Sequence, residues 1–323
     1  MRKTQIGGLL TLLAGLGMTP AHGARPTAPN LLLVERAGQP VYEAFTRDLE
    51  TALTRRGLAG IRVLERGSGL RTDPEMVHRL DRSVLIVTVG PGSLAWLLAR
   101  KPTAPVLAVY VTRDTFRRLT GSARAPVTAI YLNQPFGRFL DLAGILIPRL
   151  HAISAVLSEN QQWRRRRIEQ VAHAHGYAAH VIVTPPNPRD ILSAFRFALP
   201  GTDALIELPD ASVYNSLTLP EIFLRAFRYG VPVIGYAPEY VHDGALAGLY
   251  STPGQFSRQA LPIVLAATTR TLSRLPAPSY PRRFTVLLNR SIAGTMGIPL
   301  PGLSRILKAL HQHPRPKPVE FGI

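Results

Sequence analysis

Apolar residues in this chain gather in short unbroken runs, and each run is followed by a stretch in which apolar positions recur about every three or four residues. The run at 30–35, for example, precedes an amphipathic stretch at 41–57 that ends at Gly57. Runs that are apolar throughout are typical of strands buried on both faces of a parallel sheet. The expected strands lie at 30–35, 61–65, 83–90, 104–111 and 125–133, and the expected helices at 41–57, 73–81 and 93–101.

The same alternation begins again after residues 133–140. Two βαβ arrays of comparable length predict an α/β fold with two doubly wound, Rossmann-like lobes. Ligands of such sheets gather beyond the carboxyl ends of the strands, so two facing lobes would enclose a cleft. In the second array, the expected strands lie at 153–159, 179–185, 203–210 and 232–238, and the expected helices at 161–176, 188–199 and 219–230.

Further elements remain after these two arrays: a long helix at 254–275 that contains Pro262, a strand at 284–289 and a final helix pair within 290–310. They indicate that the chain crosses back to complete each lobe, which gives a three-segment hinge. The crossovers are expected near Tyr131–Gln134, Ser251–Gly254 and Arg283–Leu287. Lobe 1 would then contain residues 29–131 and 254–283, lobe 2 residues 132–253 and 284–311, and residues 312–323 would form a flexible tail.

The N-terminus has the pattern of a secretory signal peptide. Arg2 and Lys3 precede a short apolar run, and Pro20 and small residues follow it. The run is too short for a comfortable membrane span, which takes about 20 apolar residues. We expect residues 1–23 to be a signal peptide that is cleaved after Gly23, and the mature protein to be soluble and periplasmic.

Composition excludes several classes of protein and site. Hydrophobic residues make up 46% of the chain and charged residues 18%, as in a globular protein. The chain has no cysteine, which excludes disulfides, thiolate metal sites and a lipidated N-terminal cysteine. The formal net charge is +18, but the arginines are scattered. Their one cluster, Arg164–Arg167, is interpreted as a solvated helix face rather than a phosphate-binding patch, so no nucleic acid is expected as a partner.

Motifs of catalysis are missing. There is no P-loop, and the segment around Ser93 lacks the second glycine of a nucleophile elbow. His173 and His175 point to different faces of a helix, and His311 and His313 lie in a proline-rich tail. We therefore expect binding rather than catalysis, with no cofactor and no metal.

Several segments resemble the substrate-binding proteins of ABC transporters of the aromatic-amino-acid-binding type. The most specific are "IELPDASVYN", "GVPVIGY" and "VHDGALAGLY", and "TVLLNRSIAGTMGIPLP" near the end resembles the closing signature of that family. In the first array, "SVLIVTVGPGSLAWLL" and "PVLAVYVTRD" resemble its ligand-presenting turns. The resemblance implies the type I periplasmic binding-protein fold, and a monomer that closes on a small solute and delivers it to an ABC permease.

The chain also departs from that family. Pro209, Asp210 and Ala211 stand where the family often has Thr-Asp-Asn, so the solute, an amino acid or a related small molecule, stays open. The alternative function is a periplasmic sensory module that reports a solute to a membrane receptor or kinase. A transcription regulator of this fold would need a helix-turn-helix where the signal peptide lies.

Polar residues at the ends of the expected strands are the candidate ligand-binding residues. Ser93 could help to bind an anion or could cap its own helix, and Asp210 could hold an ammonium group or cap the helix that follows. Tyr236 could form an aromatic wall or belong to the core or rim. The candidates are Gly92, Ser93, Thr112 and Asp114 in lobe 1, and Ser158, Asn160, Asp210, Ser212 and Tyr236 in lobe 2.

Overall fold

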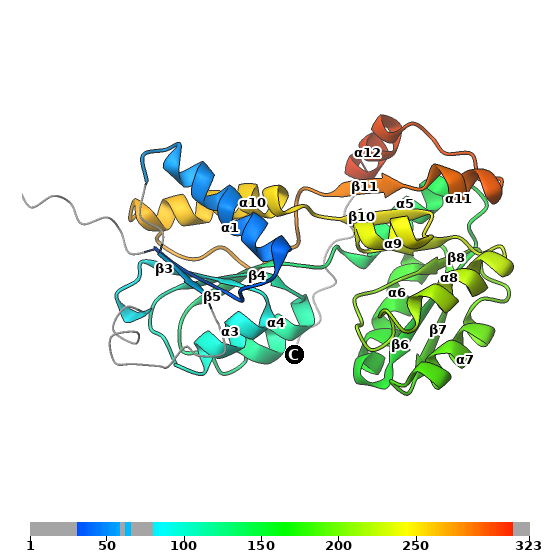
Figure 1. Cartoon of the computed structure of the whole chain (residues 1–323), viewed down its shortest axis with the longest axis horizontal. Coiled ribbons are helices and arrows are strands. Elements are labelled where there is room, and N and C mark those ends of the chain that lie inside the picture. Colours follow the sequence, from blue (N-terminus) through cyan, green and yellow to red (C-terminus); the bar gives the residue numbers. More distant parts are fainter. Residues whose placement is uncertain (1–30, 59–61, 66–79, 313–323) are drawn as a thin grey trace, which may run out of the picture.

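The chain folds into two α/β lobes placed side by side (Figure 1). The structure is a computed structural model and describes residues 31–58, 62–65 and 80–312. The expected signal peptide, most of the expected short helix at 73–81, and the expected tail from residue 313 onward, with His313, lie outside the described residues. None of the described helices is both long and apolar enough to cross a membrane.

Lobe 1 is built on a parallel sheet of five strands in the order β2-β1-β3-β4-β5. This order is that of a doubly wound sheet, whose crevice lies between its first and third strands. The strands are β1 (Leu31–Glu35), β2 (Arg62–Glu65), β3 (Leu85–Val89), β4 (Val106–Val111) and β5 (Val127–Tyr131).

Helices cover both faces of this sheet, as the unbroken apolar runs predict. Leu31 and Leu33 pack with α1 (Pro40–Thr54) and α10 (Pro253–Thr268) on one face. Leu32 and Val34 pack on the other face with α3 (Pro91–Leu98) and α4 (Arg113–Thr120). In Figure 1, α1 and α10 lie together above the sheet, and α3 and α4 lie below it. Each buried leucine of this kind contributes roughly 1.5–3 kcal/mol.

Lobe 2 repeats the topology of lobe 1. Its sheet has the order β11-β10-β9-β8-β6-β7, in which β7-β6-β8-β9-β10 corresponds to the five strands of lobe 1, and β11 is added antiparallel to β10. The strands are β6 (Ala152–Ser158), β7 (Ala178–Thr184), β8 (Ala204–Ile206), β9 (Val233–Gly235), β10 (Ala247–Tyr250) and β11 (Thr285–Leu288). The helices are α5 (Phe136–Leu146), η1 (Glu159–Arg164), α6 (Arg165–Ala174), α7 (Pro188–Ala198), α8 (Leu219–Arg228), α9 (Pro238–Asp243), α11 (Arg290–Thr295) and α12 (Leu303–Gln312).

The two lobes are joined by three segments: from β5 to α5, from β10 to α10, and from the segment that pairs with β5 at Ser279 to β11. One hydrogen-bonded chain connects all three. The Gln134 side-chain amide donates to the Ser251 hydroxyl at 2.7 Å, and this hydroxyl donates to the Arg283 carbonyl at 2.7 Å. The predicted fold, two doubly wound lobes with a three-segment hinge, is confirmed.

Two of the expected helices differ from those observed. The helix expected at 254–275 ends at Thr268, because Arg270 takes a left-handed φ of 57° and turns the chain. The helix expected at 161–176 is two elements, since the 3₁₀-helix η1 precedes α6. A 3₁₀-helix turns more tightly than an α-helix, so the residues of η1 do not continue the exposed face of α6.

Candidate functional site

The crevice of lobe 2, between β6 and β8, is closed by hydrogen bonds to Asp210. One carboxylate oxygen of Asp210 accepts from the backbone N–H and from the hydroxyl of Ser158, both at 2.9 Å, and the other accepts from the backbone N–H of Ser212 at 3.1 Å. Asp210 is buried, and the charge of its carboxylate strengthens each of these bonds. The structure therefore brings together three of the predicted site residues.

One interpretation of the sequence was that Asp210 caps the helix that follows it. The structure shows a different role. Helix α8 begins at Leu219 with Thr218 at its N-cap, well beyond the turn that contains Asp210. The carboxylate instead fastens the β8–α8 turn to the end of β6. Asn160, two residues after Ser158, is exposed in η1 and is not part of this cluster.

In lobe 1, the segment after β4 carries two predicted site residues with different roles. The Thr112 hydroxyl accepts from the backbone N–H of Thr115 at 3.2 Å and so caps α4. The backbone N–H of Arg113 donates to the Asn133 side chain at 3.1 Å, which ties this turn to the end of β5. The Asp114 side chain follows in the first turn of α4 and is 31% exposed.

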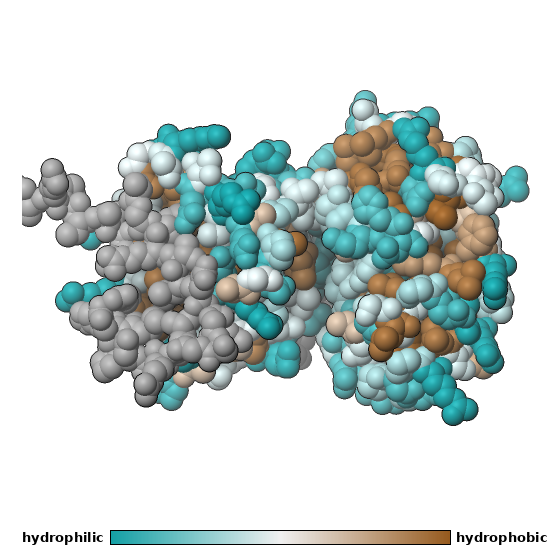
Figure 2. All heavy atoms as spheres, viewed as in Figure 1, coloured by the Kyte–Doolittle hydropathy of each residue, from teal (hydrophilic) through white to brown (hydrophobic). Residues whose placement is uncertain are grey.

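Asp114 meets Arg164 of lobe 2. The Nε atom of Arg164 lies 4.0 Å from a carboxylate oxygen of Asp114, and its Nη1 atom donates to the carbonyl of Pro209 at 3.2 Å. The Arg164 side chain is only 14% exposed. We call this meeting point of Asp114, Arg164 and Pro209 the lobe junction. Figure 2 shows the surface indented between the two lobes.

Arg164 is a site residue that the sequence pattern did not indicate. The prediction of a solvated helix face for all four arginines of the run is wrong for Arg164, which belongs to η1 and has a side chain that is only 14% exposed. Arg165, the first residue of α6, does lie on the exposed face and pairs with Glu169 at 2.8 Å. The signal that could have found Arg164 is its position in the segment directly after a strand, where the other candidates also lie.

Three arginine side chains lie close enough to Asp114 to influence its pKa. Burial raises the pKa of Asp114, and this effect outweighs the lowering by Arg164, Arg113 and Arg117. The 4.0 Å between Arg164 Nε and the Asp114 carboxylate is longer than a hydrogen bond. One carboxylate of lobe 1 faces the field of three guanidinium groups.

Tyr236 lies beside the cluster of lobe 2. Its hydroxyl accepts a hydrogen bond from the Tyr240 hydroxyl at 2.7 Å, and the two rings meet edge to face at 4.9 Å. Burial raises the pKa of Tyr236; its hydroxyl also feels the charges of Asp210 and Arg164. The half-buried ring is thus held at the carboxyl edge of β9, near the lobe junction.

Ser93 does not cap α3. The N-cap of α3 is Gly90, and Ser93 is the third residue of the helix, buried, with no hydrogen-bond partner for its hydroxyl among the described residues. Gly92 is exposed beside it. The phenol of Tyr42, a residue that the sequence analysis missed, lies against Gly90, since a Cβ atom there would be 2.6 Å from its oxygen. Tyr42 therefore covers the carboxyl end of β3, where its ring also lies 5.4 Å from that of Tyr110 of β4.

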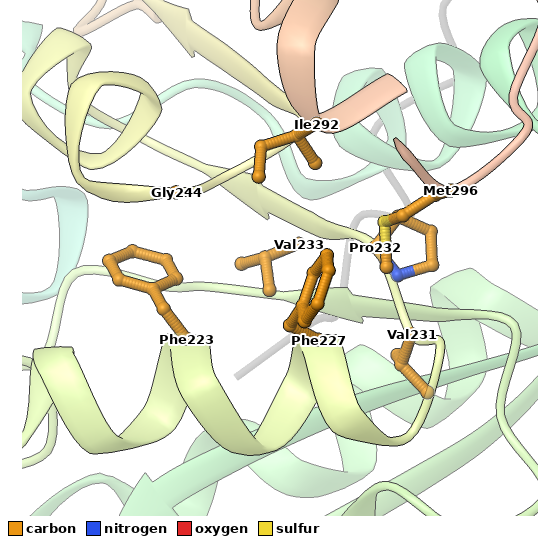
Figure 3. A pocket seen from close by; sticks show the side chains of 8 residues that line it. All are labelled: Phe223, Phe227, Val231, Pro232, Val233, Gly244, Ile292 and Met296. Carbon is orange, nitrogen blue, oxygen red and sulfur yellow. The ribbon is translucent and has the colours of Figure 1, made fainter. Parts of the chain in front are cut away.

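A small apolar pocket lies elsewhere in lobe 2, between α8, the start of β9 and α11 (Figure 3). None of the predicted site residues lines it, and its side chains offer no charge and no hydrogen bond. It is therefore distinct from the lobe junction. It is lined by Phe223, Phe227, Val231, Pro232, Val233, Gly244, Ile292 and Met296. Within the described parts of the chain, no group of three or more acidic or histidine side chains is arranged to hold a metal ion.

No protein-family model matches the chain, and no curated protein matches it. Solved structures do. A ligand-free, open substrate-binding protein with adhesive properties from Clostridium difficile is 15% identical and has a TM-score of 0.68, over 84% of this chain and 96% of that one. An ABC domain from Streptococcus pneumonia in complex with L-Trp is 15% identical with a TM-score of 0.61, over 88% and 98%. A conserved domain protein from Vibrio cholerae is 18% identical with a TM-score of 0.60, over 87% and 98%.

These similarities establish the fold alone, because the identities are low. The chain has the two-lobe fold of type I periplasmic binding proteins, in which the carboxyl edges of two parallel sheets carry the residues that face a ligand. Of these neighbours, the one from Clostridium difficile is named as a substrate-binding protein, and the pneumococcal domain was solved in complex with L-Trp.

Proposed function

We propose that the chain is an exported solute-binding protein that closes its two lobes on a small solute and delivers it to an ABC permease in the inner membrane. The observation that carries the proposal is the lobe junction, where Arg164 of lobe 2 reaches Asp114 of lobe 1 beside the Ser158–Asp210 cluster. A solute at this place would contact both lobes. Such a solute favours the closed arrangement, because only there does it make both sets of contacts.

The chemistry of the site supports binding rather than catalysis. The Ser93 hydroxyl has no base within hydrogen-bonding distance among the described residues, and a serine nucleophile needs one. The Asp210 carboxylate accepts from three donors and is held in place by them. The hydroxyls, carboxylates and guanidinium near the junction are groups that recognise a small polar molecule.

The solute is an amino acid or a related small molecule on this proposal. The L-Trp complex of the pneumococcal neighbour and the resemblance of the strand-end turns support it. Tyr236 would supply an aromatic surface. Ser158 ends β6, Thr112 follows β4 directly, and Ser212 lies in the turn after β8, all at the sheet edges that would face the solute.

A solute panel tests the proposal. Thermal unfolding of the mature protein would be followed with amino acids, small carboxylic acids, sugars and nucleosides. A solute at 100 times its dissociation constant should add about 2.7 kcal/mol to the free energy of unfolding. X-ray scattering with the same solute should report a more compact particle. If only sugars stabilise the protein, the amino-acid assignment is wrong. If no solute of the panel stabilises it, the proposed function is wrong.

Export and delivery need separate measurements. N-terminal sequencing of the periplasmic protein should begin at Ala24, and an intact Met1 would contradict export. The solute-loaded protein should stimulate the ATPase of a permease encoded beside it when that permease is reconstituted in vesicles. Stimulation of a histidine kinase in place of the permease would support the sensory alternative.

A further inference from the structure

We propose that Arg164 is a carboxylate-binding residue and that the carboxylate of the solute takes the place that Asp114 holds at the lobe junction. The inference rests on the proposed function and goes beyond it by naming the residue that selects the carboxylate of the solute. The solute is a carboxylic acid, and Arg164 determines that specificity.

The guanidinium of Arg164 is held in place by one hydrogen bond, and its other N–H donors have no hydrogen-bond acceptor in the described part of the chain. Its Nη1 atom donates to the Pro209 carbonyl at 3.2 Å, which is its one hydrogen bond in the described part of the chain. A guanidinium has further N–H donors in a fixed planar fork that matches a carboxylate. With a side chain only 14% exposed, Arg164 is shielded from water. A partly buried cation with unused donors favours an anionic partner.

Asp114 is a weak partner for this cation. Its nearest carboxylate oxygen lies 4.0 Å from Arg164 Nε, which is beyond hydrogen-bonding distance, and its side chain is 31% exposed. Asp114 therefore occupies the position where an anion is attracted without satisfying the donors there. A free carboxylate of the same shape could approach more closely, since no backbone restrains it.

Asp210, the acid next to Pro209, does not fill this place. Asp210 follows Pro209 directly, but its carboxylate oxygens accept from Ser158 and Ser212 inside lobe 2. Arg113 and Arg117 add positive field to the same region. An arriving carboxylate would therefore reduce an excess of positive charge, whereas an ammonium group alone would increase it.

Calorimetric titration of the mature protein tests the inference with paired probes in which an amide of the same shape replaces each carboxylate: L-tryptophan and L-tryptophanamide, L-phenylalanine and L-phenylalaninamide, and succinate and succinamide. Inorganic phosphate and glucose complete the set. Three variants are compared with the unaltered protein. Arg164→Gln removes the cation, Asp114→Asn removes the competing carboxylate, and Arg165→Gln removes a neighbouring arginine that lies outside the junction.

We expect at least one acid to bind and its amide to bind roughly 10- to 100-fold more weakly, the range of a hydrogen bond between charged groups. Arg164→Gln should abolish that difference. Asp114→Asn should tighten binding of the acid and leave the amide unchanged, and Arg165→Gln should bind both as the unaltered protein does.

Several results would overturn the inference while the proposed function survives: binding of glucose or phosphate in place of the acids, equal binding of an acid and its amide, or equal losses for both in Arg164→Gln. The last would mean that the arginine only braces the lobes. If none of these probes binds and the broader solute panel also gives no stabilisation, the proposed function itself fails.

Discussion

At the scale of single residues, the carboxyl group of Glu207 has an unusual environment. Glu207 follows β8 directly, is fully buried, and neither carboxyl oxygen has a hydrogen-bond partner among the described residues. Burial, with a smaller contribution from the negative charge of Asp243, raises the pKa of Glu207 to about 8. The side chain is therefore a neutral acid at pH 7, and the folded state holds a proton that the unfolded chain releases.

This difference makes stability depend on pH. Below the ordinary pKa of 4.5, Glu207 is protonated in both states, and above a pKa of about 8 it is ionised in both. Between these values only the folded state keeps the proton, so the free energy of unfolding should fall by about 1.4 kcal/mol for each pH unit. In Glu207→Gln this contribution is absent. The free energy of unfolding of the variant should therefore rise relative to that of the unaltered protein as the pH rises from 5 to 8.

Urea unfolding at pH 5, 6, 7 and 8 measures the effect. Glu221→Gln is the matched control, because Glu221 lies on the surface of α8 and pairs with Arg225 at 2.7 Å. That variant should follow the pH profile of the unaltered protein. A Glu207→Gln profile parallel to the unaltered one would mean that Glu207 is ionised in the folded state.

Asp210 has a structural role that the sequence alone did not indicate. From the sequence, Asp210→Asn should weaken binding of an ammonium-bearing solute and change stability little. In the structure, its carboxylate accepts from Ser158 and Ser212 while buried, and an amide would point an N–H₂ group at one of these donors. We therefore expect Asp210→Asn to lower the free energy of unfolding by roughly 1.5–3 kcal/mol, the range for bonds to charged groups.

Ser212→Ala is the control for this prediction, because Ser212 contacts Asp210 through its backbone N–H. Chemical denaturation of both variants without solute is the measurement. A change below about 0.5 kcal/mol in Asp210→Asn, as for an ordinary surface substitution, would show that the carboxylate is not needed to hold the turn.

At the scale of elements, the turn between β3 and α3 depends on Gly90. Its φ of 86° is one that residues with a Cβ atom rarely adopt, and an added Cβ would lie 2.6 Å from the Tyr42 oxygen. Gly90→Ala should thus destabilise lobe 1 by about 1 kcal/mol or more from the backbone alone, and should displace the Tyr42 ring. Combining it with Tyr42→Ala should relieve the part that comes from the clash.

A double-mutant cycle measured by thermal unfolding separates these two parts. Gly57→Ala is the control: Gly57 also has a positive φ, 74°, but nothing lies within 4 Å of its added Cβ atom. It should show the backbone cost without coupling to Tyr42. Additive effects of Gly90→Ala and Tyr42→Ala would mean that Tyr42 does not lie on Gly90.

The arrangement of elements follows from local pattern, whereas contacts at the site depend on distant segments. Leu31 to Val34 are all apolar because helices bury both faces of β1, and that pattern is readable in any such strand. Arg164 is different, because its environment depends on η1 replacing the first turns of an α-helix and on a residue of the other lobe. The environment of Glu207 is equally hard to predict from sequence, because no local pattern reveals that Gly235 leaves room for its carboxyl group.

At the scale of the whole molecule, the Ser251 hydroxyl connects the three segments that join the lobes, and we expect these segments to move together. It accepts from Gln134 and donates to the Arg283 carbonyl, each at 2.7 Å, and Arg138 also donates to the Gln134 side chain. Each segment alone is a short link between the lobes. Connected, they restrict the lobes to fewer relative orientations, so closing on a solute costs less conformational entropy.

Ser251→Ala removes both hydrogen bonds and should leave the fold of each lobe intact, because both bonds join residues of the connecting segments. We expect a loss of about 1–3 kcal/mol in the free energy of unfolding, from two hydrogen bonds at 0.5–1.5 kcal/mol each. We also expect a wider distribution of distances between spin labels placed at exposed positions on the two lobes, Arg118 and Arg196. The solute found by the panel should bind more weakly, because closing the lobes then costs more conformational entropy and not because contacts to the solute are lost.

Ser273→Ala, an exposed serine of lobe 1 away from the hinge, is the control and should leave all three measurements unchanged. Gln134→Leu removes the first donor and should widen the distance distribution in the same direction, since the chain is broken one step earlier. A distribution in Ser251→Ala as narrow as in the unaltered protein would show that the interlobe geometry is held elsewhere. The contact of Asp114 with Arg164 would then be the next restraint to remove, because it is the one described ion pair that joins the two lobes across the junction.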